Sequence, residues 1–293
     1  MPWALHQDLD PQLHYTPLQS STMNAPNELP ELTMQASDNE VRVRWWRYLY
    51  RSPALLWHVM IHLPITVIWV SLPGATRVRD DGTTRAESAI RWWSGGLLRV
   101  FGMRSKRIGE PHRGAALMVA NHISWLDIEL IHSQRAVHFV AKSEIAGWPL
   151  VGWVAKRGGT IYHRRGSTES LKSVSEEMVQ RLRLGHPVGV FPEGGTGDGD
   201  RVRTFHARIF QTALDGEVQI QPVALRYRIH GHYSPFVAFA ENEGFLPNFL
   251  RLLGGPVIEA ETHFLPPIDD TGEGRRRLAE RCRQAIAEVL DRP

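Results

Sequence analysis

The sequence of 293 residues has very little cysteine, and this excludes two classes of site. The single cysteine, Cys282, cannot form an intramolecular disulfide, which fits a reducing compartment. Cysteine and histidine pairs with zinc-ligand spacing are missing as well, and nothing else in the sequence demands a metal. The length suffices for one large α/β domain or for two modest domains.

Net charge is also small, because the formal value is only +3. Clusters of arginine give the chain its basic character, and such clusters suit an anionic lipid, a phosphate or a nucleic acid. No nucleic-acid-binding motif accompanies them. We therefore expect no nucleic-acid partner, and a lipid is favoured.

Residues 1–40 lack sustained hydrophobic periodicity and are rich in Pro, Gln, Asn, Ser and Thr. This composition predicts a disordered N-terminal tail. The segment also lacks the basic start and the continuous apolar core of a signal peptide.

Residues 41–106 have the composition of a membrane-associated helical segment. Charged residues are missing from Ser52–Thr76, a length that could just span a bilayer. Pro64 interrupts the middle of this stretch, His58 and His62 are polar, and arginines flank both ends, so charge gives no orientation. These features favour a bent or re-entrant anchor in the inner (cytoplasmic) membrane, with the following domain on the cytoplasmic side. A single crossing and a helical hairpin in a soluble core are the alternatives.

Residues 107–293 alternate short apolar runs with amphipathic stretches, and a helix is predicted before them over Ala86–Met103. The predicted strands are Ala115–Ala120, Ala136–Ala141, Gly159–His163, Val188–Phe191, Val218–Leu225, Pro235–Ala240 and Val257–Phe264. The predicted helices are Trp125–Ser133, Ser167–Leu184, Thr204–Leu214, Leu246–Leu253 and Gly274–Leu290. Strands that alternate with helices predict an α/β domain with a mixed, largely parallel sheet flanked by helices.

A histidine and a carboxylate follow the predicted strand Ala115–Ala120. His122, at the mouth of this strand, could act as a general base, and Asp127 could hold its second ring nitrogen and fix the tautomer. A structural interpretation is also open, in which the histidine packs beneath a loop and Asp127 caps a helix that begins near Trp125.

Two further polar blocks fall at strand ends, where α/β folds place their sites. Counting the His122–Asp127 stretch as the first block, the second block runs from Lys142 to Arg164 and combines glycines with an arginine that could bind an anionic headgroup. The third block is the turn Phe191-Pro192-Glu193-Gly194-Gly195-Thr196, which presents a carboxylate. Lys142 and Arg164 could equally be surface charges, and Glu193 could merely cap a turn.

A fourth block contains Pro222 inside the predicted strand Val218–Leu225. Proline has no N–H to give to a neighbouring strand, so this position predicts a sheet edge or a bulge.

Together the four blocks resemble those of the 1-acylglycerol-3-phosphate acyltransferase family, the HxxxxD glycerolipid acyltransferases. The resemblance covers roughly residues 91–228 and implies that His122 is the base and Asp127 its orienting partner. It also implies a set of acceptor-binding residues, namely Lys142, Arg164, Phe191, Pro192, Glu193, Gly194 and Thr196.

The third block departs from the family pattern, because Gly195-Thr196-Gly197 stands where the family has Thr-Arg. One headgroup cation is lost, for which Arg201 or Arg203 could substitute. A loop rich in Gly and Asp would suit a zwitterionic acceptor such as lyso-ornithine lipid, and the stretch from Thr204 to Arg208 is similar to that branch of the family. Both acceptors stay open.

The resemblance implies transfer of a fatty acyl group from a thioester, on acyl carrier protein or coenzyme A, to the free hydroxyl of a lysolipid such as 1-acylglycerol-3-phosphate. The implied partners are the lysolipid, the acyl thioester and the membrane. No cofactor is implied beyond this co-substrate. A lipid hydrolase and a non-catalytic lipid-binding protein are the rival hypotheses.

Overall fold

A computed structural model of the chain describes residues 42–79, 83–147, 159–163, 168–270 and 272–291. The expected tail, residues 1–40, lies outside these ranges. Residues Asn39–Pro293 form one compact unit.

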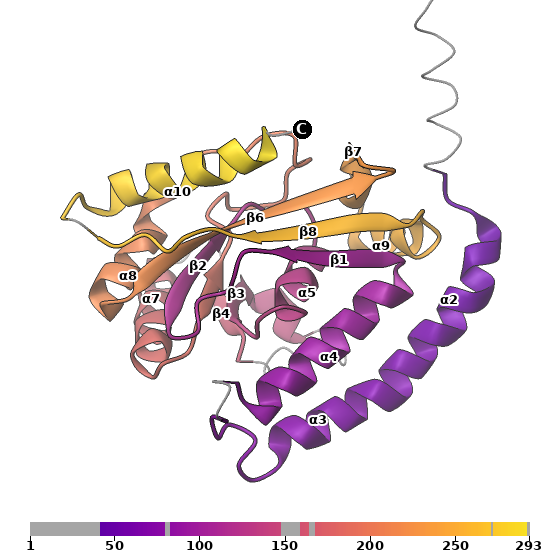
Figure 1. The fold of residues 1–293 in the computed structure, drawn as a ribbon, viewed down its shortest axis with the longest axis horizontal. Coiled ribbons are helices and arrows are strands. Elements are labelled where there is room, and N and C mark those ends of the chain that lie inside the picture. Colours follow the sequence, from indigo (N-terminus) through magenta and orange to yellow (C-terminus); the bar gives the residue numbers. More distant parts are fainter. Residues whose placement is uncertain (1–41, 80–82, 148–158, 164–167, 271, 292–293) are drawn as a thin grey trace, which may run out of the picture. The chain divides into compact units, whose positions relative to one another are not determined.

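A mixed sheet lies at the centre of the described chain (Figure 1). Its strands are β1 (Met103–Ile108), β2 (Ala116–Ala120), β3 (His138–Lys142), β4 (Ile161–His163), β5 (Val188–Val190), β6 (Gln219–Ile229), β7 (His232–Tyr233) and β8 (Ile258–Phe264). Their order is β1-β8-β6-β2-β5-β3-β4, and β7 pairs with β6. β6, β2, β5, β3 and β4 run parallel, whereas β8 and β7 run antiparallel to β6 and β1 runs parallel to β8. The predicted fold class is confirmed.

Helices cover both faces of this sheet. The helices of the described chain are α2 (Trp45–Trp57), the π-helical turn η1 (His58–His62), α3 (Leu63–Ser71), α4 (Arg85–Val100), α5 (Leu126–His132), α7 (Thr168–Arg183), α8 (Gln211–Gly216), α9 (Phe245–Leu253) and α10 (Arg275–Leu290). Short 3-10 turns occur at η2 (Ser143–Gly147), η3 (Ala207–Phe210) and η4 (Pro235–Val237).

Two hydrophobic cores hold the layers together. On one face, α4, α5 and α9 contribute Leu98, Leu130 and Leu252. On the other face, α7 and α10 contribute Met178 and Cys282. β2 is buried at every position, and its alternate residues enter the two cores. A strand covered on both faces is apolar throughout, which explains why this stretch lacks polar alternation.

Most predicted elements are present, but the strand predicted at Pro235–Ala240 is wrong. The chain there forms η4, whose first turn is capped by Ser234 Oγ accepting from the Phe236 N–H at 3.3 Å. The guanidinium of Arg251 binds the carbonyl oxygens of Phe236 and Ala238. These acceptors are therefore satisfied by a side chain instead of a neighbouring strand.

The helix predicted at Thr204–Leu214 is shorter than expected. The His206 N–H donates to the carbonyl oxygen of Pro192 at 2.9 Å, so the chain stays extended before η3 and α8 begin. The edge strand β1 was missed altogether, because Met103 is its only buried residue and MRSKRI carries no apolar alternation.

The prediction that Pro222 marks a sheet edge or a bulge is also wrong, because β6 lies between β8 and β2. Pro222 faces the point where β8 has just ended: the Leu265 N–H donates to its carbonyl oxygen at 3.0 Å. A residue with an N–H at position 222 could donate to the Leu265 carbonyl oxygen, but proline cannot. This oxygen accepts from Gln221 Nε2 at 3.0 Å instead. A neighbouring side chain thus replaces the missing donor.

The N-terminal helical segment is continuous through Pro64. α2, η1 and α3 form one helix, Trp45–Ser71, of 27 residues, which is long and apolar enough to cross a membrane. Pro64 lies in the first turn of α3, directly after the π-helical turn. The expected interruption is therefore reduced to a local change of helix type.

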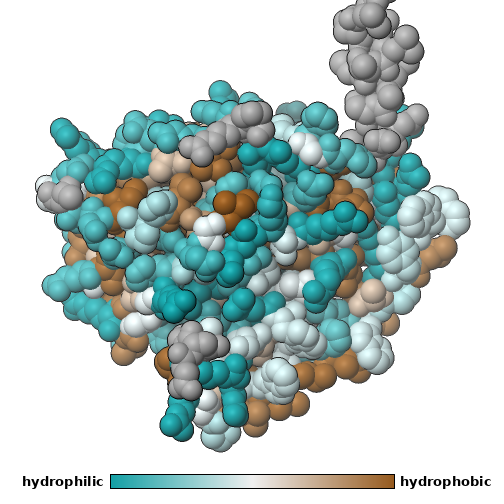
Figure 2. Space-filling model, in the orientation of Figure 1, coloured by the Kyte–Doolittle hydropathy of each residue, from teal (hydrophilic) through white to brown (hydrophobic). Residues whose placement is uncertain are grey.

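Much of this helix presents apolar side chains outward. Its exposed large hydrophobic residues are Trp45, Trp46, Leu49, Tyr50, Leu56, Trp57, Met60, Ile61, Ile65, Ile68 and Trp69. Only 17% of its most apolar window is buried. Hydrophobic surface accordingly follows the edge of the molecule formed by α2 and α3 (Figure 2). A soluble surface rarely carries so long an apolar stripe.

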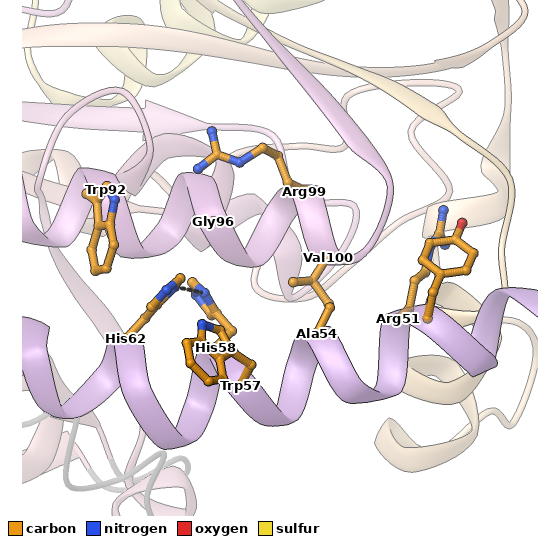
Figure 3. A pocket seen from close by; sticks show the side chains of 10 residues that line it. Arg51, Ala54, Trp57, His58, His62, Trp92, Gly96, Arg99 and Val100 are labelled. Atoms are coloured by element: carbon orange, nitrogen blue, oxygen red, sulfur yellow. Dashed lines mark hydrogen bonds between the residues drawn. The ribbon is translucent and has the colours of Figure 1, made fainter.

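α4 lies between this helix and the sheet (Figure 1). A hollow of about 360 Å³ separates α2 from α4, and histidines and tryptophans line it (Figure 3). His58 Nε2 donates to the Trp93 carbonyl oxygen at 3.0 Å, which leaves its Nδ1 to accept from His62 Nδ1 at 2.9 Å. Gly96 allows this approach, because a Cβ there would collide with the His58 ring.

Candidate active site

The side chain of Asn121 extends the ladder between β2 and β6. Its Nδ2 donates to the Leu225 carbonyl oxygen at 3.0 Å, and its Oδ1 accepts from the Leu225 N–H at 2.8 Å. The amide thus takes the place of one further backbone pair after β2 ends. His122, the next residue, is held at the carboxyl end of β2, where α/β folds place their sites.

Asp127 binds both the His122 ring and the turn before α5. Its Oδ2 accepts from His122 Nδ1 at 2.8 Å and from the N–H groups of Ile123 and Ser124 at 2.6 and 2.9 Å. The carboxylate is completely buried. The interpretation of Asp127 as a helix cap is wrong, because the N-cap residue of α5 is Trp125 and has no side-chain cap. Asp127 lies in the first turn of the helix, and one of its oxygens both fastens the preceding turn and holds the imidazole.

The other carboxylate oxygen leads to a residue that the sequence did not reveal. Asp127 Oδ1 accepts from the Tyr227 hydroxyl at 2.6 Å. Tyr227 is only 2% exposed, and burial together with the nearby Asp127 charge holds the pKa of its hydroxyl well above the usual range. The one available signal was its place in the same strand as Pro222; only the register of β6 against β2 brings it to Asp127.

Glu193 fixes the backbone of His122 from the loop after β5. Its Oε1 accepts from the His122 N–H at 2.9 Å, and its Oε2 accepts from Arg203 Nε at 3.0 Å. The side chain of Glu193 is 2% exposed, whereas that of Arg203 is 43% exposed. Both oxygens of Glu193 are thus bound within the protein. Arg203 supplies a cation beside Glu193, and the arginine that the family has in the third block is absent from this sequence.

Phe191 forms an apolar wall against the histidine. Its ring stacks on the His122 imidazole with 4.0 Å between centroids and 12° between planes. Phe139 stacks behind Phe191 at 5.4 Å. This stacking restricts tilting of the imidazole that Asp127 already holds through one nitrogen.

The glycines of the third block let its loop lie directly on the histidine backbone. The Gly197 N–H donates to the His122 carbonyl oxygen at 2.7 Å. A Cβ at Gly199 would lie 2.7 Å from Ile123 Cδ1, and Gly194 adopts φ +76°, a conformation that favours glycine. Thr196 lies half-buried in this loop.

The predicted site residues are not all brought together by the described chain. Asp127, Phe191 and Glu193 each contact His122, and Pro192, which lies between Phe191 and Glu193 in the sequence, is buried. Lys142 ends β3, but its side chain is not among the described groups. Arg164 lies outside the described residues.

The arrangement can perform proton transfer. Because His122 Nδ1–H donates to Asp127, Nε2 is left with the lone pair that can accept a proton, and the side chain is 18% exposed. Cys282 is buried, which raises the pKa of its thiol to about 12, so it is no nucleophile. Over the described residues, no group of three His, Cys, Asp or Glu side chains could hold a metal ion.

Comparisons with known proteins agree with this geometry. A family model described as Acyltransferase matches residues 105–226. The lyso-ornithine lipid O-acyltransferase of Pseudomonas aeruginosa is 36% identical over 83% of this chain and 93% of its own length. A 1-acyl-sn-glycerol-3-phosphate acyltransferase of Neisseria meningitidis is 34% identical over 55% of this chain and 64% of its own length.

A solved structure shares the fold. The 1-acyl-sn-glycerophosphate acyltransferase of Thermotoga maritima superposes with a TM-score of 0.62 at 18% identity, over 85% of this chain and 96% of that chain. Because the Pseudomonas relative is matched over nearly its full length, membership does not rest on one short motif. The chain belongs to the acyltransferase family and is a lysolipid O-acyltransferase of lipid biosynthesis.

Proposed function

We propose that His122 is the general base that takes the proton from the acceptor hydroxyl as its oxygen attacks the carbonyl carbon of an acyl thioester. Asp127 orients the imidazole and stabilises the imidazolium that forms. The observation that carries this role is the 2.8 Å contact between His122 Nδ1 and a fully buried Asp127 carboxylate, which leaves Nε2 available. The proton then returns to the thiolate that leaves, so no cofactor is needed.

The acyl donor is a thioester of acyl carrier protein or of coenzyme A. The acceptor we propose is lyso-ornithine lipid, with 1-acylglycerol-3-phosphate as the alternative. Support comes from the third block, where Gly195-Thr196-Gly197 replaces Thr-Arg, and from the 36% identity to the Pseudomonas enzyme of that name.

The loop offers both charges that a zwitterionic headgroup requires. Asp198 and Asp200 are exposed on the loop that lies over His122, and Arg203 keeps part of its guanidinium accessible while Glu193 holds it. The anionic part of the headgroup would meet Arg203, and its ammonium would meet the two aspartates. Lys142 and Arg164 complete the proposed acceptor site from the second block.

The test is a comparison of two acceptors with two donors. The purified enzyme in mixed micelles receives lyso-ornithine lipid or 1-acylglycerol-3-phosphate, each with acyl carrier protein or coenzyme A thioester, and products are identified by mass spectrometry. We expect the highest kcat/KM with lyso-ornithine lipid. Preference for the phosphate acceptor would refute the acceptor assignment, and free fatty acid formed equally well without acceptor would indicate a hydrolase.

Because it is continuous, the N-terminal helix is proposed to lie along the surface of the inner membrane instead of re-entering it, with both ends and the catalytic domain on the cytoplasmic side. Basic residues at both ends and the outward apolar side chains of α2 and α3 support this. Ser52→Cys and Thr76→Cys variants can be exposed to a membrane-impermeant thiol reagent in spheroplasts, because buried Cys282 gives little background. We expect neither position to react from outside, and labelling of one of them would indicate a single crossing.

A further inference from the structure

The two oxygens of the Asp127 carboxylate differ in how many donors hold them. Oδ2 accepts three hydrogen bonds, from the His122 ring and from the N–H groups of Ile123 and Ser124. Oδ1 accepts from Tyr227, at 2.6 Å. Since the carboxylate has no exposed surface, water cannot replace that donor.

We propose that Tyr227 is a positioning residue for acyl transfer: its hydroxyl holds the Asp127 carboxylate in one rotation and favours its ionised form, so that His122 stays oriented as an unprotonated base. This inference rests on the proposed base role of His122. Tyr227 comes from β6, outside the His122–Asp127 motif, so the strand register becomes part of the site.

The orienting effect follows from the soft torsion of a carboxylate. Rotation about the bond that carries the two oxygens is broad and roughly two-fold, so three donors on Oδ2 do not by themselves fix the plane. A short hydrogen bond on Oδ1 fixes it, because Tyr227 is clamped among core residues and is itself 2% exposed. The lone pair facing His122 Nδ1 then keeps its direction while the ring gains a proton.

The effect on protonation has a definite sign. The working state contains a neutral His122 and an ionised Asp127, and the Tyr227 hydrogen bond is strongest to that uncompensated carboxylate. When the pair takes up a proton, the carboxylate is either neutralised or shared with an imidazolium, and the tyrosine bond weakens. Tyr227 therefore favours the unprotonated pair, and removing its hydroxyl should move the acidic limb of the pH–rate profile to higher pH.

Other charged groups near the pair are left in place by a change at Tyr227. Glu193 faces the His122 backbone from the loop after β5, with Arg203 behind it. Glu129 lies on α5 two residues after Asp127. A pH shift that follows loss of one hydroxyl is thus assignable to the bond between Tyr227 and Asp127.

Tyr227→Phe removes the hydroxyl and keeps the ring. The acidic limb of the kcat/KM profile should move to higher pH by about 0.5–1 unit, and the plateau kcat should fall roughly 3- to 30-fold. Acceptor and donor KM should change less than twofold, because neither substrate touches the buried hydroxyl. An unchanged acidic limb in a folded Tyr227→Phe enzyme would overturn the proposal.

Thr212→Val is the matched control, because Thr212 is 1% exposed and donates a buried hydroxyl to the Ile209 carbonyl oxygen at 2.7 Å in the opposite core layer. Thr212→Val should lower the melting temperature about as much as Tyr227→Phe does, and it should leave the pH dependence of kcat/KM unchanged. A similar shift in Thr212→Val would show that any lost hydroxyl has this effect. Tyr227→3-fluorotyrosine strengthens the donor and should move the limb to lower pH, a sign that simple destabilisation cannot produce.

A double-mutant cycle separates this inference from the proposed function. In an Asp127→Asn background, Tyr227→Phe should have little further effect on kcat, because the anion it serves is gone. Additive losses would refute the coupling. If His122→Ala retains substantial turnover, the base role itself fails; if His122→Ala is inactive while Tyr227→Phe has the parent profile, only the role of Tyr227 fails.

Discussion

The candidate active site and the N-terminal helix differ in the side chains that they bury and expose. Around His122, buried Asn121, Asp127 and Glu193 are polar, and each is matched by specific donors or acceptors. Along the helix Trp45–Ser71, large apolar side chains face outward. The buried polar groups of the first region find their partners within the described chain, whereas the second region leaves large apolar groups exposed.

The two regions are joined through α4 and α9. Glu87 of α4 pairs with Arg135 at 2.9 Å, and both side chains are nearly buried. Arg51 of α2 donates to the carbonyl oxygens of Leu253 and Gly255 at 3.0 Å, at the end of α9. The apolar helix is therefore held by hydrogen bonds at specific places, and the following changes test each region and the joints between them.

The largest effect is expected at the histidine. His122→Ala should lower kcat by about 10²- to 10⁴-fold, since a positioned general base contributes this much. Membrane binding and melting temperature should stay close to those of the parent, because the ring is partly exposed at 18%. Steady-state turnover and thermal unfolding check both points. His232→Ala, an exposed histidine in β7, is the control and should be fully active; an active His122→Ala enzyme would remove His122 from the mechanism.

The next effect concerns the joint at α4. Arg135→Ala should destabilise the protein by about 3 kcal/mol, because it leaves Glu87 buried without its cation and frees the Arg113 carbonyl oxygen. Denaturant unfolding measures this. Arg283→Ala breaks the more exposed pair with Glu280 and should cost less than about 1 kcal/mol. Equal losses in the two variants would show that α4 is not held by the buried pair.

A smaller effect is expected on the apolar stripe. Ile68 is 57% exposed on α3. Ile68→Glu should weaken binding to anionic vesicles by about 10- to 100-fold, since burying such a side chain contributes roughly 1.5–3 kcal/mol. Vesicle sedimentation measures the partition. Ser173→Glu adds the same charge at an exposed position of α7, and this variant should bind as the parent does. Unchanged binding of Ile68→Glu would place α3 away from the membrane.

The sequence predicted the two regions through different signals. The contact between His122 and Asp127 was predictable because both residues lie within one short turn, and the 2.8 Å distance confirms it. Tyr227 was not predictable, since a hundred residues separate it from Asp127 and only the pairing of β2 with β6 joins them. Local patterns reveal local geometry, whereas strand order depends on the whole chain.

Tertiary partners also explain the wrong predictions. Pro222 has the local character of an edge residue, yet Gln221 serves the acceptor that the proline cannot, so a central position is tolerated. β1 lacks apolar alternation because it is an edge strand paired only with β8 among the described strands. The partner that decides each case lies far away in the sequence.

The smallest effect is expected at the Glu243 carboxylate, which binds Arg251 of α9 and whose contribution to stability should depend on pH. Hydrogen bonds from Arg251, with others from Asn248 and the Ala240 N–H, lower the pKa of Glu243 to about 2. Asn248 also accepts from Trp125 Nε1 at 3.1 Å, so this carboxylate supports the loop that carries His122.

A carboxyl group whose pKa is lowered by folding stabilises the folded protein above its unfolded pKa, and the contribution disappears as pH falls through the folded value. At pH 7 the free energy of unfolding of the parent should therefore exceed that of Glu243→Gln by roughly 1–2 kcal/mol. The difference is no larger because Arg251 is partly exposed, so that solvent screens the pair. This difference should shrink below about pH 4.5 and vanish near pH 2. Denaturant unfolding across that range measures it. A difference that persists unchanged at pH 2 would mean that the carboxyl shape, and not its charge, holds α9 to the loop before α5.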